Sequence, residues 1–143
     1  MARDNFTKKT VDILAERVGF LCSNPSCRVH TVGPNVQLDK STRIGEAAHI
    51  TAAAANGPRY DANLSPAQRS HINNAIWLCR NCSDLIDKDT DNHPTALLNK
   101  WKADAEYEML QKIKGANTTL LSQKNTKGCN IRLKPRLVHY CPK

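Results

Sequence analysis

The sequence contains no internal repeat and no apolar run that approaches the length needed to span a membrane. Its first residues, Met1 to Asn5, lead into a charged segment rather than into the apolar core of a secretory signal peptide. We therefore expect an intracellular, cytoplasmic protein with no membrane partner. Acidic residues are also absent from residues 115–143, which carry six basic side chains.

The length of 143 residues and the hydrophobic content of 40% fit one domain with a modest core. The formal net charge of +8 is uneven, because residues 1–114 carry 15 basic and 13 acidic side chains. The six basic residues of the C-terminal part are Lys124, Lys127, Arg132, Lys134, Arg136 and Lys143. Such a segment suits a polyanion such as DNA or RNA, although it is also typical of a solvated chain end. We expect a domain over residues 1–114 and a basic tail or linker over residues 115–143.

Four of the six cysteines form two close pairs, Cys22 with Cys27 and Cys79 with Cys82. Thiolates separated by two to four residues can close a tetrahedral zinc site, and a reducing cytosol disfavours disulfides. The pairs therefore predict a zinc knuckle that joins two distant stretches of the chain. Disulfides or free core thiols are the alternatives, and the other two cysteines have no close partner.

Apolar periodicity predicts a mixture of helices and strands. The expected helices are 7–18, 80–88 and the segment from His93 to Lys114, and the expected strands are 43–50 and 75–79. Residues 28–42 show no clear period and are interpreted as a loop. The long connection 51–73 contains one helical turn that Ser65 would cap. The last helix would bury a stripe made of Leu98, Trp101, Ala105, Met109 and Ile113.

Two side chains between the cysteine pairs can carry chemistry. Histidine has an unperturbed pKa of about 6.5 and suits the role of general base in phosphodiester hydrolysis. His49 is the candidate, at the end of an expected strand and beside a loop, although a single histidine is often structural or solvated. Asn74 precedes the second expected strand, where an ordinary turn residue is the plainer interpretation, and the adjacent Asn73 leaves its register open by one.

These features occur in an order that resembles the HNH endonucleases of the ββα-metal type with a four-cysteine zinc site. The similarity runs from about Phe20 to Trp101. Its parts are, along the chain, the first cysteine pair, Ile44-Gly-Glu-Ala-Ala-His-Ile50, Gly57-Pro-Arg-Tyr-Asp61, Asn74, the second cysteine pair, Leu85-Ile-Asp87 and Leu98-x-x-Trp101-Lys102. Each part is weak alone, whereas the ordered set is specific. The resemblance implies an α+β fold in which a small ββα-metal core with a zinc knuckle is flanked by an N-terminal helix and a long C-terminal helix.

The resemblance also implies roles for individual residues. His49 falls on the position of the general base, and Asn74 falls on the asparagine whose side-chain amide holds the loop so that the histidine is correctly aimed. The four paired cysteines would bind a structural zinc ion, so the catalytic ion, Mg²⁺ or another divalent cation, would need other ligands. Asp87 matches a position that supplies a metal ligand in some relatives and lies one helical turn after Ser83.

Two positions depart from the family pattern at the catalytic metal site. Many relatives place Asp or His just before the base and His or Asn just after the fourth cysteine, where this chain has Ala48 and Ser83. Alanine cannot bind a metal ion and a serine hydroxyl is a poor ligand by itself. Asp87 is the best remaining ligand, followed by Asp84 and Glu46, and a solvated helix residue is the alternative interpretation of Asp87. Ser83 is either native or an engineered inactivating change.

Arg59 belongs to the segment Gly57-Pro-Arg-Tyr-Asp61, which the resemblance places in the loop near the active site. Its guanidinium could contact a substrate phosphate, and Asp61 could hold Arg59 or the loop backbone. A structural turn is the alternative for this segment.

Within the family, the chain resembles the HNH domain that precedes a cyclic-oligonucleotide-sensing domain in bacterial anti-phage (CBASS) effectors. This similarity implies a metal-dependent endonuclease that cuts DNA in antiviral defence. Its regulator would be a sensor domain or a cyclic oligonucleotide outside this chain, and the chain would be either a fragment of such an effector or a stand-alone relative. A homo-oligomer is a further expected partner state. The second hypothesis is a catalytically inactive zinc-ribbon module that binds nucleic acid. The third is a nuclease that stays inactive until a partner assembles it.

Overall fold

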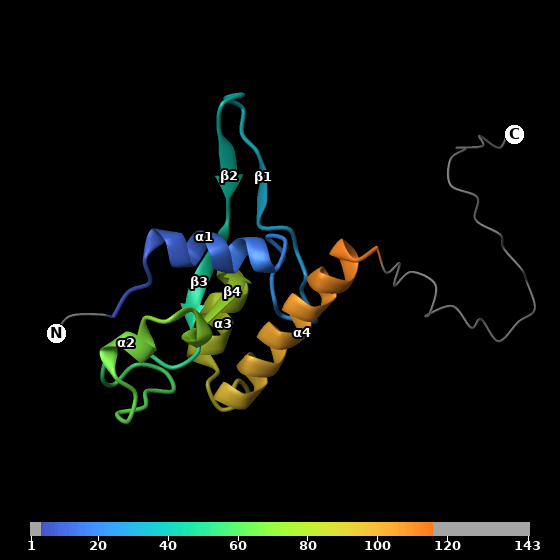
Figure 1. The fold of residues 1–143 in the computed structure, drawn as a ribbon. Helices are drawn as coiled ribbons and strands as arrows, with labels where there is room; N and C mark the ends of the chain where they lie inside the picture. Colours follow the sequence, from blue (N-terminus) through green and yellow to red (C-terminus); the bar gives the residue numbers. More distant parts are fainter. Residues whose placement is uncertain (1–3, 116–143) are drawn as a thin grey trace, which may run out of the picture.

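The computed structural model describes residues 4–115 of the chain. Within these residues the chain forms a mixed α+β arrangement with two small antiparallel sheets. The elements are, in chain order, α1 (Lys8–Arg17), β1 (Val32–Pro34), β2 (Ser41–Arg43), β3 (Gly45–His49), α2 (Pro66–Arg69), η1 (Ile72–Asn74), β4 (Ala75–Cys79), α3 (Arg80–Lys88) and α4 (Thr95–Ile113). Figure 1 shows β3 and β4 at the centre of the fold, and the hairpin of β1 and β2 projecting outward from it.

The strands β3 and β4 are antiparallel, with Gly45 opposite Cys79 and His49 opposite Ala75. The N–H group of Ile50 donates to the carbonyl of Asn74 at 2.9 Å, which continues the pairing past the end of both strands. The helix α3 begins directly after β4 because Cys79 is its N-cap residue. Two strands and a helix therefore form one unit, although the long segment 50–74 separates the strands in the sequence.

Helices cover both faces of β4, and all five of its residues are buried. Successive side chains of a strand point to opposite faces. Ile76 and Leu78 belong to a core cluster with residues of α3 and α4, whereas Ala75 and Trp77 belong to a second cluster with residues of α1. Because β4 is buried on both faces, the strand and the helix that follows it have a fixed position in the core.

A glycine in β3 makes room for the largest buried side chain. Trp77 is 1% exposed, and its Nε1 donates to the hydroxyl of Thr31 at 2.9 Å. A Cβ atom at Gly45 would clash with the indole ring of Trp77 and would lie 2.7 Å from the hydroxyl oxygen of Thr31. Position 45 therefore accepts a larger residue only if Trp77 moves.

Several elements expected from the sequence are confirmed. The strand at residues 75–79 and the helix at residues 80–88 have the predicted bounds. The helical turn in the long connection is α2, in which Ser65 and Gln68 form a reciprocal capping box. These are the elements whose sequence signals were local, namely a continuous apolar run and a serine cap before proline.

The interpretation of residues 28–42 as a loop is wrong in part, because β1 and most of β2 lie there. Each strand has three residues, β2 is fully exposed, and β1 ends at Pro34, so no alternation of apolar and polar residues marks the hairpin.

The buried stripe of α4 is also shorter than expected. Leu98 and Ala105 are buried, but Ile113 is 83% exposed because the helix extends past the core at this end.

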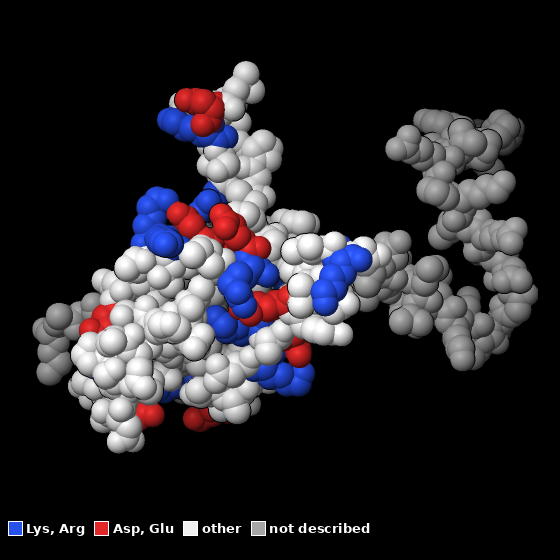
Figure 2. Space-filling view, viewed as in Figure 1, with Lys and Arg blue, Asp and Glu red and all other residues white. Residues whose placement is uncertain are grey.

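Charged residues of both signs are mixed in the described part of the chain. Residues 4–115 contain 14 lysines and arginines and 13 aspartates and glutamates. Figure 2 shows basic and acidic side chains next to one another on one face, and few charges around α2. The basic tail expected over residues 115–143 lies, apart from Gly115, outside the described residues. Among the described helices, none combines the length and the apolar character needed to cross a membrane.

Candidate functional site

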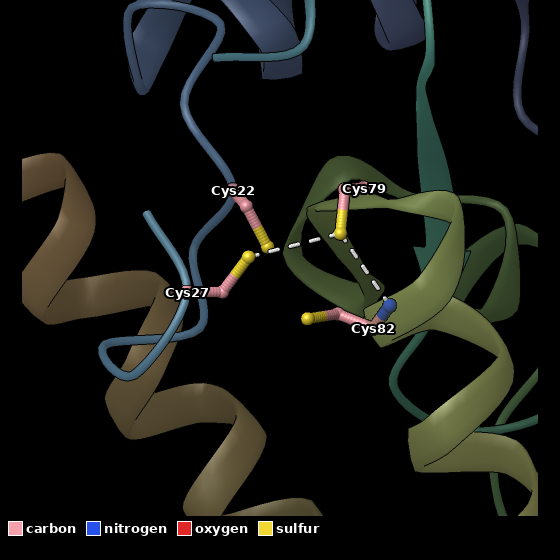
Figure 3. A group of neighbouring side chains, drawn as sticks. All are labelled: Cys22, Cys27, Cys79 and Cys82. Atoms are coloured by element: carbon pink, nitrogen blue, oxygen red, sulfur yellow. Dashed lines mark hydrogen bonds between the residues drawn. The ribbon is translucent and has the colours of Figure 1, made fainter. Parts of the chain in front are cut away.

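The two cysteine pairs meet in space, as Figure 3 shows. Cys22 and Cys27 come from the turn after α1, whereas Cys79 ends β4 and Cys82 lies in the first turn of α3. All four are free thiols, their sulfur atoms lie within 4.8 Å of one another, and the Sγ atoms of Cys27 and Cys79 are 3.9 Å apart. Sulfur atoms in a tetrahedron about 2.3 Å from a zinc ion are about 3.8 Å apart. The cluster can therefore hold a metal such as zinc.

Polar hydrogens point at the sulfur atoms of this thiol cluster. The Nδ2 group of Asn24 donates to the Sγ of Cys82 at 3.3 Å, and the N–H of Cys82 donates to the Sγ of Cys79 at 3.5 Å. Asn24 also shapes the turn between the first two cysteines, because its Oδ1 accepts from the N–H of Ser26 at 3.0 Å. Such N–H groups favour the thiolate form that binds metal.

Burial opposes ionisation of two of the thiols. It raises the pKa of Cys82 to about 11 and also raises the pKa of Cys22, whereas the backbone N–H of Val29 lowers the pKa of Cys27. A divalent cation among the four sulfur atoms would supply the positive charge that buried thiolates need. Four thiolates also leave no open coordination position, so the donor set fits a structural metal ion rather than a catalytic one.

A second candidate centre begins at His49, which is half-buried at the end of β3. Its Nε2 lies 2.9 Å from the carbonyl oxygen of Asp4, and its ring stacks on Phe6 with 4.0 Å between ring centroids and an angle of 18°. A carbonyl oxygen only accepts hydrogen bonds, so Nε2 carries the hydrogen. In the neutral ring Nδ1 is then the basic nitrogen.

Asn74 holds the backbone of the loop that follows His49. Asn74 is only 8% exposed, and its Nδ2 donates to the carbonyls of Thr51 at 2.8 Å and Arg69 at 3.0 Å. Its Oδ1 accepts from the N–H of Thr51 at 2.9 Å. The side chain of the adjacent Asn73 makes no hydrogen bond within the described residues. Of the two asparagines, Asn74 is thus the one whose amide fixes the loop.

Lys102 of α4 supports the same turn from the interior. Its Nζ donates to the carbonyls of Ile72 and Ala75, both at 2.7 Å, and these residues lie on either side of Asn74. Burial lowers the pKa of Lys102. No role was predicted for this lysine, although its place directly after Trp101 in the Leu98-x-x-Trp101-Lys102 motif was a usable signal.

Arg59 lies inside the fold, and its side chain is only 6% exposed. Its guanidinium donates to the carbonyls of Ile50 at 2.7 Å and Ile86 at 2.6 Å, and to the Oδ1 of Asp87 at 2.8 Å. Its backbone φ of 56° lies in the left-handed region, which is uncommon for arginine. This geometry favours a structural role over the expected phosphate contact. The carboxylate that holds Arg59 is Asp87, not Asp61, because the guanidinium points toward the end of α3.

Three of the residues expected at the site line one cleft of about 580 Å³ between β3, the loop 52–58 and α3. They are His49, Ser83 and Asp87, and the carboxylates of Glu46 and Asp84 line the same cleft. Asn74 does not line it but lines a different cavity of about 640 Å³. The structure therefore places the histidine and the acidic residues around one opening, and the asparagine outside it.

The oxygen donors of this cleft fit a divalent cation only in part. Asp87 has 48% of its side chain exposed, but its Oδ1 is engaged by Arg59, and Ser83 is 6% exposed. Among residues 4–115, the thiol cluster is the only group of three or more His, Cys, Asp or Glu side chains that could hold a metal. Ser83 and Asp87 thus do not form a complete catalytic metal site by themselves.

No protein-family model matches the chain, and no curated protein sequence matches it. Its function is therefore inferred from its own residues and their geometry.

The sequence predicted no role for Asp4 or Phe6, yet both contact His49. Asp4 is separated from His49 by 45 positions, and no periodic pattern links them. Phe6 precedes the N-cap residue Thr7, a position where an apolar residue usually serves as a hydrophobic staple for the helix. Its contact with a histidine could not be deduced from that pattern.

Proposed function

We propose that this chain is an HNH-type endonuclease that hydrolyses phosphodiester bonds in DNA. The observation that carries the proposal is the placement of His49 at the end of β3, beside a loop that the amide of Asn74 holds and facing acidic residues of α3 across one cleft. A thiol cluster joins the turn after α1 to the junction of β4 and α3. This combination supports hydrolysis more directly than it supports binding alone.

In this proposal His49 is the general base. Its Nε2 is held by the carbonyl of Asp4, so Nδ1 is the nitrogen that takes a proton from the attacking water. Positive charge for the phosphate would come from exposed cations of α3, because Arg59 is engaged within the fold. Arg80 is 80% exposed and lies 3.7 Å from Glu46, and Lys88 is 78% exposed. Exposed ion pairs of this kind are weak and can exchange partners.

Two metal ions belong to the proposal, with different support. Zinc in the thiol cluster is supported by four convergent sulfur atoms and a closed donor set. A catalytic Mg²⁺ or similar hard cation has support only from Asp87 and Ser83 in the cleft. Because Mg²⁺ commonly keeps several water ligands and uses substrate phosphates, an incomplete protein shell is compatible with it.

An inactive zinc-ribbon module that binds nucleic acid is the second candidate function. Specific observations favour it: Ala48 offers no ligand, Ser83 is a poor one, and Asp87 is paired with Arg59.

The resemblance to defence effectors adds the proposal that a sensor domain, a cyclic oligonucleotide or self-association regulates the protein. The near balance of charges in residues 4–115 gives the described part no large electrostatic attraction for DNA.

A plasmid-cleavage assay tests the endonuclease. The full chain is incubated with supercoiled DNA and Mg²⁺ or Mn²⁺, with EDTA as the metal-free control. We expect His49→Ala to reduce the cleavage rate by about 10²- to 10⁴-fold. The matched control is His30→Ala, because His30 is exposed and does not line the cleft.

The wild-type chain must be folded and zinc-loaded in this assay. If it then leaves the plasmid intact with every cation, the endonuclease proposal for this chain fails, and retained DNA binding in a gel-shift assay would favour the inactive module. The variant Ser83→His tests the missing ligand, and activity gained by it would identify position 83 as the cause of a weak or silent site.

Zinc is tested separately by elemental analysis. We expect about one zinc per chain in freshly purified protein, and loss of both zinc and thermal stability in Cys79→Ser. The control Cys129→Ser changes a cysteine outside the two pairs. Zinc well below one per chain, in protein purified without chelators, would overturn the zinc assignment without touching the assignment of His49.

A further inference from the structure

The N-terminal segment Asp4 to Phe6 passes over His49 before α1 begins. It contacts the histidine twice, through the carbonyl of Asp4 at 2.9 Å from Nε2 and through the ring of Phe6, which stacks on the imidazole at a centroid distance of 4.0 Å. The N–H of Asp4 also donates to the carbonyl of Ala53 at 3.4 Å, on the loop that lines the cleft. One segment therefore contacts both the candidate base and the wall of its cleft.

The segment is anchored by an ion pair that lies mostly inside the fold. The Nε of Arg69 donates to the Oδ2 of Asp4 at 2.7 Å, and the two side chains are 12% and 20% exposed. Arg69 also donates to the carbonyl of Leu64. The carbonyl of Arg69 in turn accepts from the Nδ2 of Asn74 at 3.0 Å. Contacts thus run from His49 through Asp4 and Arg69 to Asn74 without a gap.

We propose that Asp4 and Phe6 are positioning residues for His49, and that Arg69 couples them to the Asn74 turn. This inference rests on the proposed function, in which His49 is the base. The carbonyl of Asp4 selects the tautomer with hydrogen on Nε2, and the ring of Phe6 fixes the plane of the imidazole. The N-terminal segment is thus part of the catalytic centre, although it lies outside the motif that extends from Phe20 to Trp101.

The physical reason is that an imidazole has two nearly equivalent nitrogens and a ring that can rotate. A base works only when the correct nitrogen faces the water within hydrogen-bond reach, and a misplacement of about 1 Å can cost about 10²-fold in rate. An acceptor fixed at one nitrogen and an aromatic ring against one face remove both freedoms. Without them, the ring samples the other tautomer and other orientations.

The direct test measures the tautomer of His49 by ¹⁵N NMR of the ring nitrogens in the full chain at a pH where the ring is neutral. We expect the wild-type ring to carry its hydrogen on Nε2. In Asp4→Ala the Arg69 anchor is lost, and we expect a mixture of tautomers. In Phe6→Leu the stacking ring is lost, and we again expect a mixture of tautomers. Phe6→Tyr keeps the aromatic ring, so we expect it to show the wild-type spectrum.

The matched control is Asp12→Ala, which likewise removes an ion-paired aspartate near the N-terminus, here one that pairs with Lys8 and Arg43. We expect Asp12→Ala to leave the His49 signals unchanged. Phe6 packs against the core cluster that contains Trp77. Thermal unfolding of each variant therefore shows whether a changed His49 signal comes from the lost contact or from loss of the fold. A single Nε2–H tautomer that persists in folded Asp4→Ala and Phe6→Leu would overturn the inference.

Cleavage kinetics provide the second readout. We expect Asp4→Ala to lower kcat by about 10-fold with little change in KM, because the segment orients the base without touching substrate. Unchanged kcat together with an altered tautomer would show that the segment sets the ring but not catalysis, and would overturn the positioning role. The NMR result stands whether or not the chain cleaves DNA, so failure of the endonuclease proposal and failure of this inference are distinguishable.

Discussion

The side-chain amide of Asn74 pairs with the backbone of Thr51 in both directions, accepting from its N–H at 2.9 Å and donating to its carbonyl at 2.8 Å. Thr51 is the second residue after His49, so this pairing fixes the direction in which the chain leaves β3. An asparagine can do this because its side chain carries both a donor and an acceptor, like the backbone itself. Asn74 thus acts as an extra rung beyond the end of the two strands.

Asn74→Asp keeps the size of the side chain but removes its donor. The carbonyls of Thr51 and Arg69 then lose their partner in a buried setting and face a carboxylate instead, and we expect the free energy of unfolding to fall by about 1–3 kcal/mol. Urea unfolding measures this change. Asn73→Asp is the control, since the side chain of Asn73 makes no hydrogen bond within the described residues. Equal losses in both variants would contradict the assignment of the loop-holding role to position 74.

The sequence predicted the parts of this site that depend on local pattern. A continuous apolar run defines β4, a serine cap defines α2, and paired cysteines mark the thiol cluster. It did not predict which polar groups meet. Arg59 was expected to face substrate but lies in the interior, because its left-handed backbone turns the side chain toward the carbonyls of Ile50 and Ile86. Such contacts depend on the path of a long loop, which no periodicity records.

Arg59→Met tests whether Arg59 is structural. Methionine retains much of the apolar volume but leaves the carbonyls of Ile50 and Ile86 without donors, and we expect a loss of about 2–4 kcal/mol in unfolding free energy. The control Arg80→Met removes a guanidinium that is 80% exposed, with an expected change below about 0.5 kcal/mol. A variant of Arg59 that keeps full stability and raises KM for DNA would instead identify Arg59 as a phosphate contact.

Gly45→Ala tests the packing of β3 against the core. The added methyl group meets the indole of Trp77, whose Nε1 is held by Thr31, so relief requires the ring to move. We expect a destabilisation of about 1–3 kcal/mol, measured by thermal or urea unfolding. Gly33→Ala is the matched control, because a Cβ atom there would have no neighbour within 4 Å. Its effect should stay within about 0.5 kcal/mol, and comparable losses at both positions would contradict the packing explanation.

Glu106 links α4 to α1 and should make stability depend on pH. Burial by itself raises the pKa of Glu106, but the hydrogen bond from Arg17 and the charge of Lys102 outweigh burial and hold the pKa below its ordinary value. A carboxylate with a lowered pKa in the folded state stabilises the fold above its unfolded pKa, and this contribution is lost as pH falls through the lowered value. The stabilisation is therefore present at neutral pH and disappears in acid.

Glu106→Gln removes this dependence. We expect the variant to be less stable than the wild type by about 1 kcal/mol at neutral pH, since the ion pair with Arg17 is partly exposed. The difference should shrink as pH falls from neutral through the lowered pKa of Glu106, because the wild type loses the same contribution when Glu106 is protonated. Unfolding midpoints measured over this range check the prediction. The control is Glu16→Gln, because Glu16 is an exposed residue of α1 that forms no ion pair within the described residues. Its curve should run parallel to that of the wild type. A Glu106→Gln curve that also stays parallel would show that the charged carboxylate of Glu106 does not stabilise the fold through Arg17 and Lys102.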